Sequence, residues 1–263
     1  MYKLSISTMV YLSLPPSKAI ERLTSRGFRA IEVSYTNFLV NSVREFAELN
    51  RVAEVVSRHS LEVFSIHLPY DRIGVDELSL ASTLSRFFKW IRILDRLGVN
   101  FYVTHLPELP ASEKSIYTAA RFIKNIAESV GGNSLILVEN TTSSVHIGSS
   151  PRWLAEILRS VDTANVGVCV DVGHALVARV PIEEFRKQLG ALVRAVHLHD
   201  NDGLSDKHFL PGRGILRVSE LAEFIAAVKP LYVVAEVACR GLAECDALLS
   251  KVRDLKSTLG VST

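Results

Sequence analysis

The feature that most restricts the fold of this chain is its regular alternation between short apolar segments and longer amphipathic ones. Eight segments have the length and the Val, Ile and Leu content of buried strands, and each is followed by a segment with helical periodicity. The expected strands are 3–7, 28–33, 61–67, 99–105, 135–139, 166–171, 192–199 and 231–236. The expected helices are 17–26, 42–58, 76–97, 112–130, a helix that begins at Ser150 and Pro151, 181–189, 218–228 and 242–255. Eight consecutive strand–helix units predict an α/β fold, a closed (β/α)8 TIM barrel.

The length and continuity of the chain favour a single barrel domain over residues 1–263. The chain has 263 residues, and a barrel of this kind takes about 250. No linker, low-complexity tract or break in composition interrupts the pattern. Because no Gly-x-Gly-x-x-Gly motif follows the first expected strand, a dinucleotide-binding fold is not indicated.

Side chains that can bind metal ions stand at the C-terminal ends of six of the eight expected strands. They are His67, His105, Glu139, Asp171, His197 with His199, and Glu236. The C-terminal strand ends of a barrel meet at one mouth, where barrel enzymes carry their active sites. Carboxylates and imidazoles that share one cavity would be costly to desolvate unless cations were bound among them. The pattern therefore predicts a metal site at this mouth.

The densest group of ionisable residues follows the seventh expected strand. Residues 197–202 are His-Leu-His-Asp-Asn-Asp, 206–208 are Asp-Lys-His, and 211–214 are Pro-Gly-Arg-Gly. The side-chain period of a strand places His197 and His199 on the same face. Taken alone, the stretch is equally compatible with a polar surface loop. Its coincidence with the other strand ends is what favours a metal site.

A second pair of ligands is indicated by Asp171-Val172-Gly173-His174. Gly173 is expected to let the backbone turn sharply, so that Asp171 and His174 face one centre. Cys169, two residues before Asp171, is expected to be a buried thiol that points into the barrel. Glu32, near the end of the second expected strand, is compatible with either the mouth or the surface.

Composition and charge restrict the compartment and the partners. A net charge of +2 is low for a dedicated nucleic-acid-binding protein, although it does not exclude DNA as a substrate. The three cysteines form no Cys-x-x-Cys pair and at least one must be unpaired, so a reducing, intracellular setting is expected. No apolar run approaches the length of a membrane span, and the N-terminus is too polar for a signal peptide. We expect a soluble, cytoplasmic protein without a membrane partner; the sequence does not predict its oligomeric state.

Taken together, the strand-end residues, Asp171-Val172-Gly173-His174, His197-Leu198-His199-Asp200 and Asp206-Lys207-His208 resemble the xylose isomerase-like TIM-barrel superfamily. This superfamily includes the endonuclease IV family of apurinic-site endonucleases and many sugar isomerases and epimerases. The resemblance covers nearly the whole chain and is strongest from Val138 to Glu236.

The endonuclease IV branch implies up to three zinc ions, held by histidines and carboxylates. The matching positions are His67, His105, Glu139, Asp171, His174, His197, Asp206, His208 and Glu236. On this hypothesis the catalytic residues are Glu139, Glu236 and His174, and the substrate-binding residues are Tyr70, Lys207, Arg213 and His199. Tyr70 matches a tyrosine that this branch uses against DNA, and Lys207 stands where it carries arginine.

The chain also departs from the endonuclease IV pattern. The Ala-Gly-Gln expected after Glu139-Asn140-Thr141 is absent, the first two loops lack the DNA-reading segment, and Arg213 replaces an acidic residue. We therefore expect a metal centre that handles a substrate smaller than duplex DNA.

Three functions follow from the resemblance. The leading hypothesis is a multi-zinc phosphoester hydrolase acting on a small phosphoester or on abasic DNA. The alternative is an isomerase or epimerase of a small sugar or sugar phosphate. It would use one Mn²⁺, Mg²⁺ or Co²⁺ held by Glu139, Asp171, His197 and Glu236. The third is a metal-binding barrel without catalysis.

Overall fold

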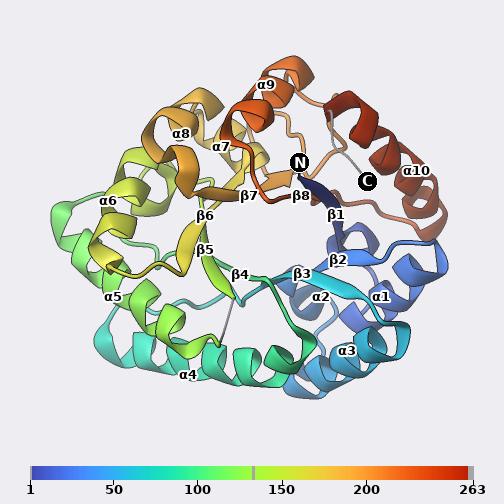
Figure 1. Ribbon diagram of the computed structural model, residues 1–263, viewed down its shortest axis with the longest axis horizontal. Helices are drawn as coiled ribbons and strands as arrows, with labels where there is room; N and C mark the ends of the chain where they lie inside the picture. Colours follow the sequence, from blue (N-terminus) through green and yellow to red (C-terminus); the bar gives the residue numbers. More distant parts are fainter. Residues whose placement is uncertain (1, 132–133, 260–263) are drawn as a thin grey trace.

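The computed structural model describes residues 2–131 and 134–259 and forms a closed barrel of parallel strands surrounded by helices (Figure 1). The strands are β1 (Lys3–Ser7), β2 (Ala30–Val33), β3 (Glu62–His67), β4 (Phe101–Thr104), β5 (Leu135–Glu139), β6 (Val166–Asp171), β7 (Val193–Leu198) and β8 (Tyr232–Ala235). Each strand pairs with its neighbour in sequence, and β8 closes on β1 with Lys3 opposite Tyr232. The predicted (β/α)8 barrel is confirmed.

The outer layer consists of one long helix after each strand. These helices are α1 (Pro16–Ser25), α3 (Glu45–His59), α4 (Glu77–Leu94), α5 (Glu113–Ser129), α6 (Pro151–Val161), α8 (Ile182–Leu189), α9 (Val218–Val228) and α10 (Leu242–Leu259). Each buries its apolar stripe against the strands, as Leu154, Ile157 and Val161 of α6 do. The ring closes where α10 lies beside α1, and Asp246 pairs with Arg22 at 2.6 Å.

Several short helical segments also occur. All were unpredicted except residues 95–97, which fall within the expected helix 76–97. They are α2 (Tyr35–Val40), α7 (Val172–Ala178) and the 3-10 segments η1 (Thr8–Tyr11), η2 (Asp95–Leu97), η3 (Ile147–Ser149) and η4 (Gly190–Leu192). They are too short for a periodic pattern, and the local signal of η1, α2 and α7 is a side-chain cap at the N-terminus. The side chain of Ser34 accepts from the Thr36 N–H at the start of α2, and that of Asp171 accepts from the His174 N–H at the start of α7.

The interior of the barrel is filled by side chains that range in size from alanine to phenylalanine. Phe101, Val103, Leu137, Cys169 and Ala195 form a buried cluster of their own. Glu139, Asp171 and His197 lie two positions after Leu137, Cys169 and Ala195 of this cluster. Because side chains alternate along a strand, they lie on the same face, nearer the mouth of the barrel. The buried thiol of Cys169 is as predicted, and burial raises its pKa to about 12.

Two details differ from the sequence analysis. The strands β4, β7 and β8 end at Thr104, Leu198 and Ala235, so His105, His199 and Glu236 lie just beyond them. Cys239 and Cys245 form a disulfide, whereas reduced cysteines were expected. The loop between β8 and α10 brings these two sulfurs together, and no local motif marks that contact. Among the described helices, none has both the length and the apolar character that crossing a membrane requires.

Candidate metal centre

The predicted ligands gather at the C-terminal ends of the strands in three neighbouring groups, two of which share a residue. The central group consists of Glu139, Asp171, His197 and Glu236, and the β3–β4 group of His67, His105 and Glu139. The α7 group consists of His174, His199, Asp206 and His208. Within each group the candidate ligand atoms lie within 4.8 Å of one another. All nine residues expected as metal ligands are thus brought together, and His199 joins them.

Glu139 is shared between the β3–β4 group and the central group. Its Oε2 lies 2.9 Å from His67 Nε2 and 3.4 Å from His105 Nε2. Its Oε1 lies 3.3 Å from His197 Nδ1, which is also 3.2 Å from Glu236 Oε2. A carboxylate in this position can bridge two cations.

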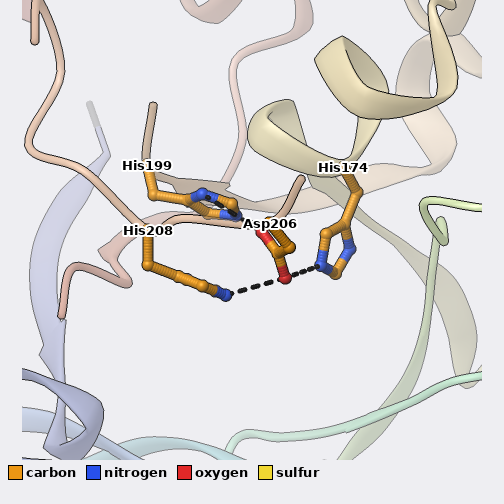
Figure 2. A group of neighbouring side chains, drawn as sticks. All are labelled: His174, His199, Asp206 and His208. Carbon is orange, nitrogen blue, oxygen red and sulfur yellow. Dashed lines mark hydrogen bonds and ion pairs between the residues drawn. The ribbon is translucent and has the colours of Figure 1, made fainter. Parts of the chain in front are cut away.

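In the α7 group Asp206 lies between the other side chains (Figure 2). Its Oδ2 is 2.9 Å from His208 Nε2 and 3.2 Å from His174 Nε2. The loop that carries Asp206 and His208 is held by Asn201, whose side-chain oxygen accepts from the backbone N–H groups of Lys207 and His208. These contacts join the loop to the end of β7.

Four of the imidazoles use one ring nitrogen for a fixed hydrogen bond and turn the other toward carboxylates. Three of them donate to backbone carbonyls: His67 Nδ1 to Leu68 at 2.9 Å, His174 Nδ1 to Asn140 at 2.8 Å and His208 Nδ1 to Glu236 at 2.8 Å. The fourth, His197, donates from Nε2 to Glu32 Oε2 at 2.9 Å. Metal-binding histidines are oriented in this way, because the hydrogen bond fixes the tautomer and frees the second nitrogen for the metal.

The donor set fits divalent cations. Two ligands of a tetrahedral zinc ion lie about 3.4 Å apart, and the nitrogen–oxygen separations of 2.9 to 3.4 Å within the groups are close to that value. In addition, His105 Nε2 and His199 Nδ1 are buried and have no hydrogen-bond partner. A buried polar atom without a partner is costly, and a cation beside each nitrogen would remove that cost.

Opposite charges hold the ionisable groups of the site in their charged forms. Burial alone would raise the pKa of Glu139, but His197 and His105 keep that pKa well below its usual range. Burial alone would lower the pKa of His197, but the acidic groups around it, from Cys169 and Glu32 to Glu139, raise it well above its usual range. For His105 burial prevails, and its pKa is lowered. A histidine binds a metal ion only in its neutral form, so bound cations would displace the protons of these imidazoles.

Two residues that support the ligands were missed or left ambiguous. Glu32 is fully buried and accepts hydrogen bonds from His197 Nε2 at 2.9 Å and from Ser65 Oγ at 2.7 Å. Asn140 exchanges two hydrogen bonds with the backbone of Asp171, at 2.8 and 2.9 Å. The only sequence signals are the strand-end position of Glu32 and the position of Asn140 next to Glu139.

A cavity of about 600 Å³ opens above the ligands. Its lining includes seven ligands of the three groups, His67, His105, Glu139, His174, Asp206, His208 and Glu236. Tyr70 also lines it, stacks on His105 with ring centroids 5.2 Å apart, and shares a 3.0 Å hydrogen bond with Thr36. The volume suits a small molecule.

Lys207 and Arg213, expected to bind substrate, are exposed and are not among the residues that line this cavity. The buried carboxylate of Asp200 explains the course of the loop around Arg213, since it accepts from the backbone N–H groups of Gly212, Gly214 and Leu216. Among the described lining residues, Arg72 carries the one guanidinium. His199, also expected to bind substrate, is fully buried beneath the cavity.

Comparisons with known proteins agree with this architecture. A family model described as "xylose isomerase-like TIM barrel" matches residues 20–255. An uncharacterised protein of Methanocaldococcus jannaschii is 27% identical over 237 residues, which cover 84% of this chain and 78% of that protein. A probable endonuclease 4 of Thermoplasma volcanium is 28% identical, over 74% of this chain and 75% of that protein. The crystal structure of a D-tagatose 3-epimerase-like protein shares the fold, with a TM-score of 0.79, 23% identity and coverage of 98% and 97% of the two chains.

Proposed function

The chain belongs to the family of xylose isomerase-like TIM barrels, and we propose that it is a phosphoester hydrolase that works with two or three zinc ions. The observation that carries the proposal is the sharing of Glu139 between two groups of ligands, with the α7 group beside them. A single cation would need the central group alone. The remaining imidazoles and carboxylates of the β3–β4 group and the α7 group would then bind no cation.

The residues fall into defined roles under this proposal. The β3–β4 group and the central group would hold two cations joined by Glu139, and the α7 group a third. When bound, the cations of the β3–β4 and central groups would supply Lewis acidity toward phosphoryl oxygens and lower the pKa of water. Glu236 lines the cavity, so its carboxylate can orient a water molecule or accept its proton, and His174 holds Asp206 at the edge of the cavity.

The cavity favours a small phosphoester over duplex DNA as substrate. Its volume of about 600 Å³ matches a small molecule, and Arg72 offers a guanidinium fork to an anionic group. Abasic DNA is the second substrate to test, because a probable endonuclease 4 is among the relatives. Zinc-loaded protein should hydrolyse small phosphodiesters or monoesters, and a chelator should abolish the reaction.

The contribution of Arg72 to substrate binding is tested with a second arginine as the control. Arg72→Gln should raise KM for an anionic phosphoester about tenfold or more, since a charge-assisted hydrogen bond is lost. Arg213→Gln, which removes an exposed arginine away from the cavity lining, should leave KM unchanged. Failure of the zinc-loaded chain to cleave any phosphoester or abasic duplex would contradict the hydrolase proposal.

A second candidate function, isomerisation or epimerisation of a small sugar, is favoured by the central group. Three carboxylates and one imidazole suit a single harder cation such as Mn²⁺, Mg²⁺ or Co²⁺. The D-tagatose 3-epimerase-like structure with the same fold makes this candidate worth testing. His105→Gln separates the two functions. A hydrolase should lose a cation and most of its activity, whereas an enzyme that uses only the central group should keep both.

A further inference from the structure

We propose that the α7 group is a closed zinc site of four protein ligands with a structural role, and that His199 is its fourth ligand. The inference deepens the proposed function, on which it rests for the identity of the ion. Figure 2 shows His199 and His208 on one side of Asp206 and His174 on the other. The ligand atoms of all four residues lie within 4.8 Å of one another.

The contacts of His199 are those expected of a metal ligand. Its imidazole is fully buried, and its Nε2 donates to Asp171 Oδ1 at 2.9 Å. Its Nδ1 has no hydrogen-bond partner and faces Asp206 Oδ1 at 3.8 Å. A carboxylate that orients one ring nitrogen while the other is free for a metal is the common arrangement around metal-binding histidines.

Gly173 shows that the space for this imidazole is built into the fold. A Cβ atom at residue 173 would lie 2.0 Å from His199 Cε1 and 2.2 Å from its Nδ1. The backbone of Gly173 does not have the positive φ that would itself require glycine. The sharp turn expected at Gly173 is therefore not its role. A residue without a side chain is needed in α7 because the ring of His199 occupies that place.

The number of ligands separates the α7 group from the β3–β4 group. Structural zinc sites are closed by four protein ligands, whereas catalytic sites have three and leave a position for water or substrate. The α7 group offers three imidazoles and one carboxylate that no other group contains, and the β3–β4 group offers two imidazoles and one carboxylate. The central group also has four ligands, but one of them, Glu139, is shared with the β3–β4 group. We assign the tightly held ion to the α7 group, where it would join α7, the end of β7 and the loop at 206–208.

Zinc release tests this assignment. The zinc-loaded full chain is mixed with the chromogenic chelator 4-(2-pyridylazo)resorcinol, and the release of each equivalent is followed with time. The wild-type protein should retain one slowly released equivalent of zinc per chain. His199→Gln keeps a donor toward Asp171 but lacks the Nδ1 ligand, so this equivalent should be released at least about tenfold faster. His59→Gln, which changes an exposed histidine of α3, should release it at the wild-type rate.

Two further variants keep the test decisive. Gly173→Ala leaves all four ligands in the chain but displaces the His199 ring, and it should also accelerate release, which covers the case in which His199→Gln does not fold. Glu236→Gln should leave the slow equivalent in place, because Glu236 belongs to the central group. The assignment would be overturned if the slowly released equivalent of zinc persisted in both His199→Gln and Gly173→Ala, or if it disappeared in Glu236→Gln. A wild-type chain that holds the slow zinc but cleaves no phosphoester contradicts the proposed function alone.

Discussion

Among single residues, Glu139 connects the most ligands. Its two oxygens face His67 and His105 on one side and His197 on the other, at 2.9 to 3.4 Å. The sequence predicted Glu139 as a ligand because it ends an apolar strand. Its bridging position depends on the relative placement of β3, β4, β5 and β7, which only the closed barrel defines.

Replacing Glu139 tests whether the β3–β4 group and the central group share it as a metal ligand. Glu139→Gln keeps the size of the side chain but removes its charge, so two groups lose a shared ligand. We expect the zinc content to fall by at least one equivalent per chain and hydrolysis to fall by more than about 100-fold. Glu108→Gln, which changes another carboxylate of the cavity lining, is the control. Unchanged zinc content in Glu139→Gln would contradict the bridging role.

Glu32 acts on the metal site through another residue. It accepts from His197 Nε2 at 2.9 Å and so turns His197 Nδ1 toward Glu139 and Glu236. From the sequence, Glu32 was compatible with either the mouth of the barrel or the surface, because no local pattern in β2 indicates its contact with His197 of β7.

We expect Glu32→Gln to weaken zinc binding by about 10- to 100-fold while the fold is retained, because a neutral amide is a poorer acceptor for the imidazole N–H. The readout is competition for zinc against a chelator of known affinity. Glu32→Asp, which keeps the charge, should recover part of the affinity. An affinity equal to that of wild type in Glu32→Gln would show that His197 needs no such partner.

At the scale of elements, the long helices and the strands follow directly from local periodicity. The short helices α2 and α7 were missed because six or seven residues cannot display a repeat. They nevertheless carry or contact residues of the candidate site. His174 lies in α7, and Tyr35 of α2 contacts Tyr70 in the loop that follows β3, with ring centroids 5.4 Å apart. Arg86 of α4 anchors that loop, with ion pairs to Asp71 at 2.9 Å and to Glu45 at 2.6 Å.

The ion pair between Arg86 and Asp71 should make the stability of the fold dependent on pH. Burial would raise the pKa of Asp71, but hydrogen bonds from Tyr35 and Arg86 outweigh it and lower that pKa. A carboxyl whose pKa is lower in the folded state stabilises the fold above its unfolded pKa of about 4, and this stabilisation is lost as the pH falls through the folded pKa. Asp71→Asn should therefore lower the free energy of unfolding at pH 7, and the difference from wild type should shrink toward pH 3. Denaturant titrations at both pH values measure it. A difference independent of pH would contradict the proposed ion pairing.

For the whole molecule, the convergence of strand ends is why a site could be predicted from the sequence. Ligands far apart in the chain, such as His67 and Glu236, needed only the inference of a closed barrel to be placed together. Lys207 and Arg213 could not be placed, because hydrogen bonds of Asn201 and Asp200 determine the course of the loop at each of them. The disulfide of Cys239 and Cys245 and the role of Gly173 likewise depend on contacts between segments that carry no local signal.

The central claim, a site for several cations, is tested most directly by the metal content of the chain purified without chelators. Elemental analysis should find two to three equivalents of zinc per chain, because the β3–β4 and central groups share Glu139, the α7 group has its own ligands, and together they provide ligands for three ions. One equivalent of manganese, magnesium or cobalt and no zinc would contradict the claim. The central group alone would then be the metal site, and sugar isomerisation would take the place of phosphoester hydrolysis.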